Sequence, residues 1–299
     1  MKKLTSFLVM SLLFLASCSQ AIDELAGSSQ GQQSAQQPTR TVTLNLSRSS
    51  EDVNPVDIKE ISIYVYQIER KKDSLVYAKT MQVGDGNLNV ELPLGENLQT
   101  FVVANAPSVT DTDSLATVKI NLGQNCAEEV YISDIVSFKS DYTTSNVDIT
   151  LHRLVGQAVF SPKESLEDIA AFGKFDKVDV TFTNVATSYK VQSKEVEVSD
   201  VTLSANQDNG YKVSAYSFPT TEAGTSTGIT YKMYQGANLV NETAALIDAA
   251  VVFEPSKRYV IEVPLTDEGY VKTPWDEASA QTRAAKAKKT PISVTVTDF

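Results

Sequence analysis

The stretch Thr41-Val42-Thr43-Leu44-Asn45-Leu46-Ser47 alternates polar and apolar residues without a break. Successive side chains of a β-strand point to opposite faces, so this pattern predicts a strand whose buried face carries Val42, Leu44 and Leu46. The same period continues after this stretch, with clusters of Gly, Asn, Asp and Pro between the segments. The strand-like segments of the first half include residues 58–66, 76–83, 88–92, 98–104, 130–138 and 147–152. Short alternating strands at this spacing predict an all-β sandwich.

A second set of strand-like segments follows and predicts a second sandwich. It comprises residues 154–160, 178–182, 189–198, 211–218, 229–234, 251–254 and 258–265. One short helix is expected at residues 114–119. We place the domain boundary at His152 to Leu154, which gives domains at residues 41–152 and 153–299. Within the second domain, residues 266–290 predict a linker, with a local helix as the alternative, and residues 291–299 predict a terminal strand.

The N-terminal segment has the pattern of an export signal. Lys2 and Lys3 precede a short apolar run that ends at Leu15-Ala16-Ser17-Cys18. A basic start, an apolar core and small residues before the cut are typical of a secretory signal, and the cysteine indicates a bacterial lipoprotein. We expect residues 1–17 to be removed and Cys18 to carry acyl chains. An ordinary signal peptide with an incidental cysteine is the alternative, and a transmembrane anchor would need about 20 apolar residues.

Residues 18–40 read as a tether between the lipid and the folded body. They are rich in Ser, Gln, Ala and Gly and have few residues able to form a core. Such a composition predicts a disordered segment. The sequence therefore predicts a protein that is exported and tethered to a membrane by lipid.

Composition limits the classes of function. The formal net charge of −11 becomes −13 once Lys2 and Lys3 leave with the signal, and an acidic surface disfavours nucleic-acid binding. With Cys18 acylated, Cys126 has no partner for a disulfide, so the fold must depend on apolar burial. His152 is the only histidine, which argues against histidine triads and multi-histidine metal sites. We expect no cofactor and no metal.

The last segment of the chain repeats the pattern of the first strand. Ile292, Val294 and Val296 form one face, and Ser, Thr and Thr alternate with them. A groove shaped for the early strand could therefore accept the terminal one, and a missing strand supplied by another chain is β-strand addition. Burial of three such side chains contributes roughly 5–9 kcal/mol. The simpler alternative is that both segments are edge strands that never leave their own domains.

With these segments in place, the chain resembles a fimbrillin, a subunit of the type V pili of Bacteroidota. The resemblance covers most of the mature length and depends on the order of several segments. Those segments are the lipobox ending at Cys18, the strand at residues 41–46, the strand at 58–66, the apolar strand ending in Ala104-Asn105, the arginine-containing junction at 151–160, and the closing strands at 258–263 and 292–297.

The resemblance implies two tandem transthyretin-like Greek-key β-sandwich domains and export to the outer membrane as a lipoprotein. It also implies that an arginine-specific surface protease cuts after the first strand, at Arg48. The displaced strand with Val42, Leu44 and Leu46 would then leave. A donor strand with Ile292, Val294 and Val296 from the next pilus subunit would fill the groove. Arg40 is the second candidate, but a cut there opens no groove.

Two departures from the family pattern leave the role of the subunit open. Major subunits often end shortly after a tryptophan, whereas Trp275 is the only tryptophan here and the chain stops at Phe299. The chain is also shorter than many stalk subunits. A lipid-retained anchor subunit that stays uncut is therefore an alternative, as is a minor or tip subunit.

Two other classes of function fit the sequence less well. A tethered lipoprotein that captures surface glycans would use exposed aromatic residues, for which Tyr64, Tyr66 and Trp275 are the candidates, although strand positions favour a core role for the tyrosines. An enzyme is the weakest hypothesis. The paired acids are Glu128 with Glu129 and Glu195 with Glu197. Alternation with valines marks the second pair as the solvent face of a strand, so we expect no catalysis.

Ser74 and Ser114 each lie in an Asp-Ser-Leu triplet. This triplet resembles the O-glycosylation acceptor of exported Bacteroidota proteins. The alternative is that both triplets are simply turn entries.

Overall fold

The computed structural model describes residues 38–50, 52, 57–70, 72–83, 88–220, 228–245, 252–266 and 293–299. The described chain is almost entirely β, with one short α-helix, α1 (Leu166–Phe172), and one 3₁₀ turn, η1 (Gln207–Asn209). The predicted all-β fold is confirmed. The signal, Cys18, Trp275 and Ile292 lie outside the described residues. The division into two tandem Greek-key domains, with its boundary at residues 152–154, stays a prediction.

The first sheet is formed by strands from the N-terminal half. Its order is β3-β2-β5-β8-β10-β1-β4, and β9 pairs with β5. It encloses a core to which Ile63, Val65, Leu92 and Val102 contribute. The strands are β1 (Thr39–Arg48), β2 (Glu60–Glu69), β3 (Lys72–Gln82), β4 (Leu88–Pro93), β5 (Asn97–Ala104), β8 (Tyr131–Ser133), β9 (Val136–Lys139) and β10 (Asn146–Arg153).

The second and third sheets are formed mainly by the C-terminal half. The second has the order β14-β11-β17-β18, and the third the order β16-β15-β12-β7-β6, with β13 beside β12. A second, larger core cluster includes Phe160, Phe182 and Tyr231. The strands are β6 (Ser108–Thr110), β7 (Lys119–Asn121), β11 (Gly156–Pro162), β12 (Lys177–Lys190), β13 (Val196–Asn206), β14 (Val213–Ser217), β15 (Ile229–Gln235), β16 (Asn238–Ala245), β17 (Lys257–Val263) and β18 (Ser293–Asp298).

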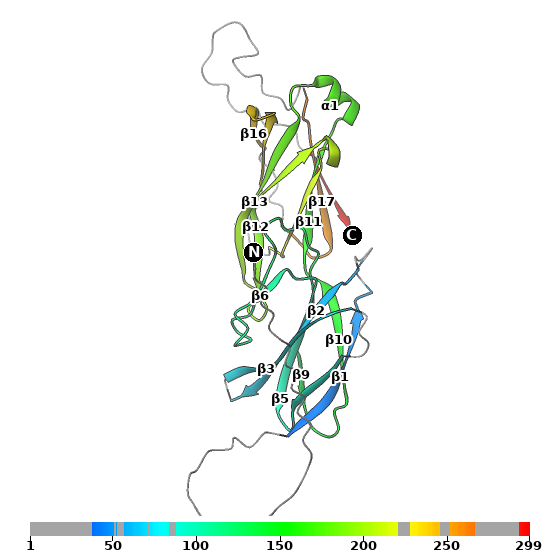
Figure 1. The fold of residues 1–299 in the computed structure, drawn as a ribbon, viewed down its shortest axis with the longest axis vertical. Coiled ribbons are helices and arrows are strands. Elements are labelled where there is room, and N and C mark those ends of the chain that lie inside the picture. The colour runs from blue at the N-terminus through cyan, green and yellow to red at the C-terminus, as the bar shows by residue number, and fades with distance from the viewer. Residues whose placement is uncertain are drawn as a thin grey trace, which may run out of the picture. The chain divides into compact units, whose positions relative to one another are not determined.

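Strand β1 is an interior strand of the first sheet. It pairs in parallel with β10 and antiparallel with β4, and Figure 1 shows it in blue beside β10. The alternating pattern explains its placement, because Val42 and Leu44 are buried while Thr41 and Asn45 are exposed. Its one-sided apolar row thus faces the first core.

Three predicted elements were wrong. Residues 114–119 form turns closed by bonds from Thr117 back to the Ser114 carbonyl, and a strand, not a helix, begins at Lys119. The segment 189–198 breaks into β12 and β13 around a tight turn in which Lys194 takes a positive φ of 61°. The segment 251–254 is not a strand where it is described, because the backbone of Phe253 bonds to Thr220 instead of a neighbouring strand.

Other differences are one predicted strand that is divided in two and elements that the sequence pattern did not predict. The segment 130–138 divides into β8 and β9, and β16 was missed because its Asn and Glu residues hide the alternation. Helix α1 was missed as well. It is held by its ends: Ser165 caps the first turn through the Asp168 N–H, and Gly173 ends it in the left-handed conformation.

Candidate functional site

Strand β1 fills a slot between β10 and β4 in the first sheet. Residues Thr43 to Arg48 pair with β10, and Thr39 to Leu44 pair with β4. Among the described strands, β4 pairs with β1 alone. Loss of β1 would therefore open both a backbone groove and the apolar site that Val42 and Leu44 fill.

The outer face of β1 makes a regular set of polar contacts. Thr43 donates from Oγ1 to Asn89 at 2.9 Å, and Asn45 donates from Nδ2 to Asp148 at 2.9 Å. The hydroxyls of Ser47 and Thr150 lie 3.2 Å apart. The small polar side chains at every second position of this face therefore have hydrogen-bond partners on β4 and β10.

Arg48 is the last residue of β1 and is half-buried. It pairs with Leu151 of β10, and the next residue, Ser49, donates its N–H to the Leu151 carbonyl at 2.8 Å. The Arg48 guanidinium lies over the Tyr131 ring, 5.5 Å from its centroid. Protease access at this residue therefore requires local opening of the strand end.

Arg40 lies at the other end of β1. Its guanidinium donates to the Asp141 carbonyl and lies over the exposed ring of Tyr142. A cut there would leave Val42 and Leu44 in the sheet, as the sequence indicated.

Strand β18 occupies an edge. Among the described strands it pairs with β17 alone, from Glu262 opposite Ser293 to Lys257 opposite Asp298. Val294 is half-buried and Val296 is 53% exposed, in contrast to Val42, which is 0% exposed. The apolar row of this C-terminal tail, which comprises β18 and Phe299, is thus only partly buried against its own subunit.

The residue after β18, Phe299, lies in a buried site, which we call the Phe299 seat. It is 4% exposed, and its N–H donates to the Ser256 carbonyl at 3.2 Å. The guanidinium groups of Arg153 and Arg258 lie 4.3 Å and 4.9 Å from the centroid of its ring. Burial and two cation–π contacts therefore hold the end of the tail.

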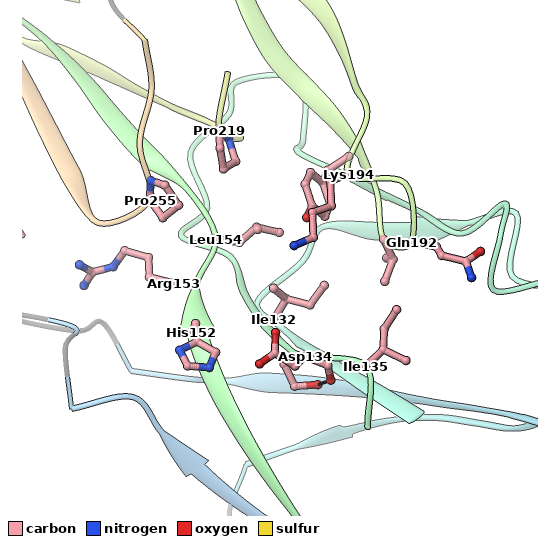
Figure 2. A pocket seen from close by; sticks show the side chains of 13 residues that line it. Ile132, Asp134, Ile135, His152, Arg153, Leu154, Gln192, Lys194, Pro219 and Pro255 are labelled. Carbon is pink, nitrogen blue, oxygen red and sulfur yellow. Dashed lines mark hydrogen bonds between the residues drawn. The ribbon is translucent and has the colours of Figure 1, made fainter. Parts of the chain in front are cut away.

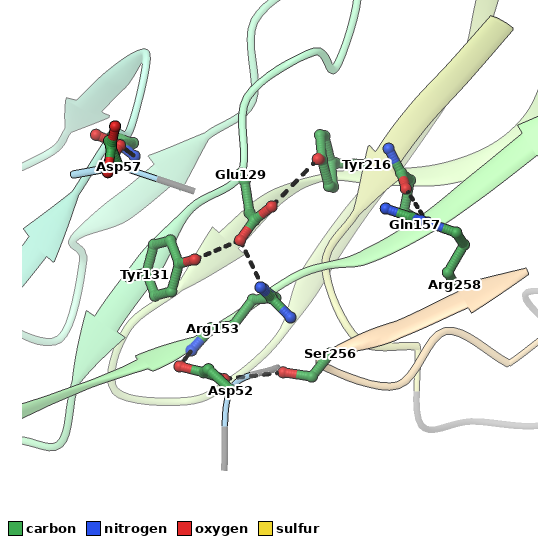
Figure 3. A network of polar contacts seen from close by, with 10 residues as sticks. Asp52, Asp57, Glu129, Tyr131, Arg153, Gln157, Tyr216, Ser256 and Arg258 are labelled. Atoms are coloured by element: carbon green, nitrogen blue, oxygen red, sulfur yellow. Dashed lines mark hydrogen bonds and ion pairs between the residues drawn. The ribbon is translucent and has the colours of Figure 1, made fainter. Parts of the chain in front are cut away.

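A buried charged network lies beside this seat. Glu129 accepts from Arg153 Nε at 2.6 Å, from the Tyr131 hydroxyl, and from the Tyr216 hydroxyl at 3.3 Å (Figure 3). Burial alone would lower the pKa of Arg153, but the combined interactions with Glu129 and Tyr131 outweigh burial and raise the pKa. Burial, strengthened by Glu129, raises the pKa of Tyr131 and of Tyr216 to about 12. Both phenols therefore stay protonated at neutral pH, and the Arg153 guanidinium stays charged.

The two Asp-Ser-Leu triplets meet in space. The Ser114 hydroxyl donates to both carboxylate oxygens of Asp73, at 2.9 and 3.0 Å. Ser74 is exposed on β3. Of the two serines, Ser74 is the more exposed one.

The remaining candidate residues take part in core packing or in surface ion pairs. Tyr64 and Tyr66 are buried and stack against Phe101, which confirms the core role favoured for them. Glu195 and Glu197 are exposed and pair with Lys190 and Lys119, respectively. The described part of the chain contains no cluster of three or more residues suited to hold a metal, and no described helix is long and apolar enough to span a membrane.

A cleft of about 720 Å³ lies near the start of β11. It is lined by Asp134, His152, Tyr189, Lys194, Pro219 and Pro255, among others. Figure 2 shows Ile132, Leu154 and Lys194 around the hollow, each from a different segment. The cleft combines one acid, one ammonium group and apolar walls.

Sequence reasoning missed the Phe299 seat and the Glu129 network. Glu129 and Arg153 stand 24 residues apart, and Arg153 and Phe299 are joined only by the tertiary fold. The usable signal was the arginine in the apolar junction at residues 151–160, because a charge buried in such a run needs a partner.

No model of a protein family matches the chain, and no curated protein matches it in sequence. Solved structures do match it. A candidate adhesin from Bacteroides ovatus aligns with TM-score 0.52 and 12% identity over 87% of this chain and 100% of its own. A candidate cell adhesion protein from Bacteroides eggerthii gives 0.51 and 14% over 88% and 96%. A candidate polysaccharide-binding protein from Bacteroides thetaiotaomicron gives 0.51 and 12% over 78% and 93%. At these identities the likeness shows a shared fold.

Proposed function

We propose that this chain is a structural subunit of a surface fimbrium, exported as a lipoprotein through Cys18 and assembled by strand exchange in support of adhesion. The observation that carries the proposal is the contrast between β1 and β18. β1 is an interior strand with a buried apolar row, whereas β18 is an edge strand with the same pattern and a partly exposed row. The shared fold with candidate adhesins supports the same role.

The assembly step begins with a cut after Arg48 by an arginine-specific surface protease. β1 then leaves the slot between β10 and β4, and β18 of a neighbouring subunit enters it. Burial of Val296, which is 53% exposed in its own body, favours this transfer by about 1 kcal/mol. The partners are thus other pilus subunits and the protease, at the outer membrane.

The polar face of the tail suits the slot in a parallel register. With Val294 in the place of Leu44, Thr295 falls opposite Asp148, where Asn45 now donates. Thr297 then falls opposite Thr150, where the Ser47 hydroxyl lies. The hydroxyls of the tail can therefore replace the side-chain hydrogen bonds that β1 makes.

Conservative arginine replacements test the cleavage step. An arginine-specific protease should convert the purified chain into a product that begins at Ser49 and forms oligomers, read by N-terminal sequencing and size-exclusion chromatography. The Arg48→Lys variant keeps the charge but removes the cut and should stay monomeric. The matched control, Arg40→Lys, should assemble like the unmodified chain.

Oligomers formed equally well by Arg48→Lys would overturn the cleavage step. The anchor alternative gives a different result in cells, because an anchor subunit would be recovered with acyl-Cys18 in place of an N-terminal Ser49.

The cleft favours one second candidate, capture of a surface glycan. Asp134, His152 and Lys194 could bond sugar hydroxyls, while Pro219 and Pro255 supply apolar faces. Binding on a glycan array that the Asp134→Ala and Lys194→Ala variants both lose would support it. An array without any signal would rule it out.

A further inference from the structure

Two residues that follow β1, Ser49 and Asp52, contact β10 and the turn that binds Phe299. After Arg48, Ser49 donates its N–H to the Leu151 carbonyl at 2.8 Å. Asp52 then accepts the Arg153 N–H at 3.2 Å and the Ser256 hydroxyl at 3.0 Å, as Figure 3 shows. One carboxylate thus joins the end of β10 to the turn that precedes β17.

Ser256 binds the backbone at the end of the tail. It takes a positive φ of 60°, which is unfavourable for a residue with a Cβ. Its N–H donates to the Val155 carbonyl, its hydroxyl donates to Asp52, and its carbonyl accepts the Phe299 N–H. A change in the bond to Asp52 therefore acts on the residue whose carbonyl binds Phe299.

A second connection runs through side chains, and we call it the arginine–aromatic row: Arg48, Tyr131, Arg153, Phe299 and Arg258. The Arg48 and Arg153 guanidiniums lie 5.5 and 5.8 Å from the centroid of Tyr131. Arg153 and Arg258 lie within 4.3 and 4.9 Å of Phe299. The row thus extends from the last residue of β1 to the seat of the tail.

We propose that Asp52 and the arginine–aromatic row couple the presence of β1 to the docking of β18, so that removal of β1 releases the tail for its neighbour. This inference rests on the proposed function and adds an order of events to it. While β1 is in place, the tail stays bound to its own body. A subunit would then offer its donor strand only after it has opened its own slot.

The cut itself changes both connections. Hydrolysis of the Arg48–Ser49 bond consumes one water molecule and leaves a carboxylate on Arg48 and an α-amino group on Ser49. Arg48 departs with β1, so the row loses its first member. The new ammonium group lies close in sequence to Asp52 and competes with Ser256 for its carboxylate.

Hydrogen exchange of the uncut chain tests the coupling. We expect the Asp52→Ala variant to raise the exchange rates of the amides of residues 293–299 by about tenfold, the effect of losing one hydrogen bond to a charged group. Arg48→Gln, which removes one member of the row and leaves the backbone intact, should raise them a few-fold. The matched control is Asp200→Ala, because Asp200 also accepts a backbone N–H, at 3.1 Å from Asn184, and contacts neither connection.

A double-mutant cycle completes the test. Phe299→Leu keeps an apolar side chain but removes the ring, and Asp52→Ala should have little further effect on tail exchange in its presence. Effects that simply multiply would overturn the coupling, as would Asp52→Ala and Arg48→Gln variants that behave like Asp200→Ala. Because the uncut monomer is measured, this result is independent of whether the cut protein forms oligomers.

Discussion

Arg153 carries a charge in a place where water does not reach it. Its side chain and that of Glu129 are 0% and 3% exposed, and Nε lies 2.6 Å from the carboxylate. Removing one partner from a buried pair leaves the other charge without compensation, which costs more than the pair itself contributes. Arg153 also reaches Phe299, so this pair sets the geometry of the tail seat.

At the residue scale, the Glu129→Gln variant should therefore be strongly destabilised. We expect the free energy of unfolding to fall by about 3–5 kcal/mol. The control is Glu128→Gln, whose side chain is exposed and whose effect should stay within about 0.5 kcal/mol. Urea titrations of both variants measure the difference. Equal midpoints would show that the pair is not needed.

The raised pKa values of the two tyrosines that contact Glu129 predict a loss of stability in alkali. The pKa values of Tyr131 and Tyr216 rise from 10.0 in the unfolded chain to about 12 in the fold. The unfolded chain therefore loses these protons first. Their contribution to stability is complete below about pH 10 and is lost as the pH rises towards 12.

Urea midpoints measured from about pH 9 to about pH 11.5 should fall, and the fall should be smaller in the Tyr131→Phe/Tyr216→Phe double variant. Tyr142→Phe, which removes an exposed tyrosine, should leave the profile unchanged. A profile equally steep in the double variant would contradict the assignment.

At the scale of the element, β1 and β18 have the same pattern and different surroundings. Val42→Asp would place a carboxylate in the first core without a partner and should prevent folding or cost several kcal/mol. Val296→Asp lies on an exposed side chain and should change the stability of the monomer by only about 0.5 kcal/mol. The same change should abolish oligomers of the cut protein, because Val296 must enter the slot.

Thr297→Ser on the opposite face of β18 keeps the hydroxyl that falls opposite Thr150, so it is the control and should permit assembly. Thermal unfolding and size-exclusion chromatography of the three variants separate the two effects. Assembly of Val296→Asp to the same extent as Thr297→Ser would show that the apolar row of the tail is not the contact surface.

The elements also show how far sequence patterns reach. Alternation found β1, β4 and β10, because each buries one face and exposes the other. Alternation failed where tertiary contacts determine the secondary structure. At Asn184, a positive φ of 55° lets β12 bulge and continue past the predicted end of its strand at residue 182. The same limit applies to the candidate site. Alternation predicted β1, whereas it could not predict the partners of Arg153 and Phe299, because these come from distant segments.

At the scale of the whole molecule, we expect a monomer that stays closed until β1 is removed. The interior strand is held on both sides and by its buried row, while the equivalent tail is held at one edge and by Phe299. The uncut chain should therefore be stable as a monomer. Its ability to bind a second copy should appear only with the open slot.

The most direct measurement of this claim is the affinity of a labelled peptide of residues 291–299, Pro-Ile-Ser-Val-Thr-Val-Thr-Asp-Phe, for the chain before and after cleavage at Arg48. We expect binding to the cut chain from which β1 has left, no binding to the uncut chain, and loss of binding when Val296 of the peptide is replaced by Asp. Equal binding to both forms, or binding to neither, would contradict strand exchange.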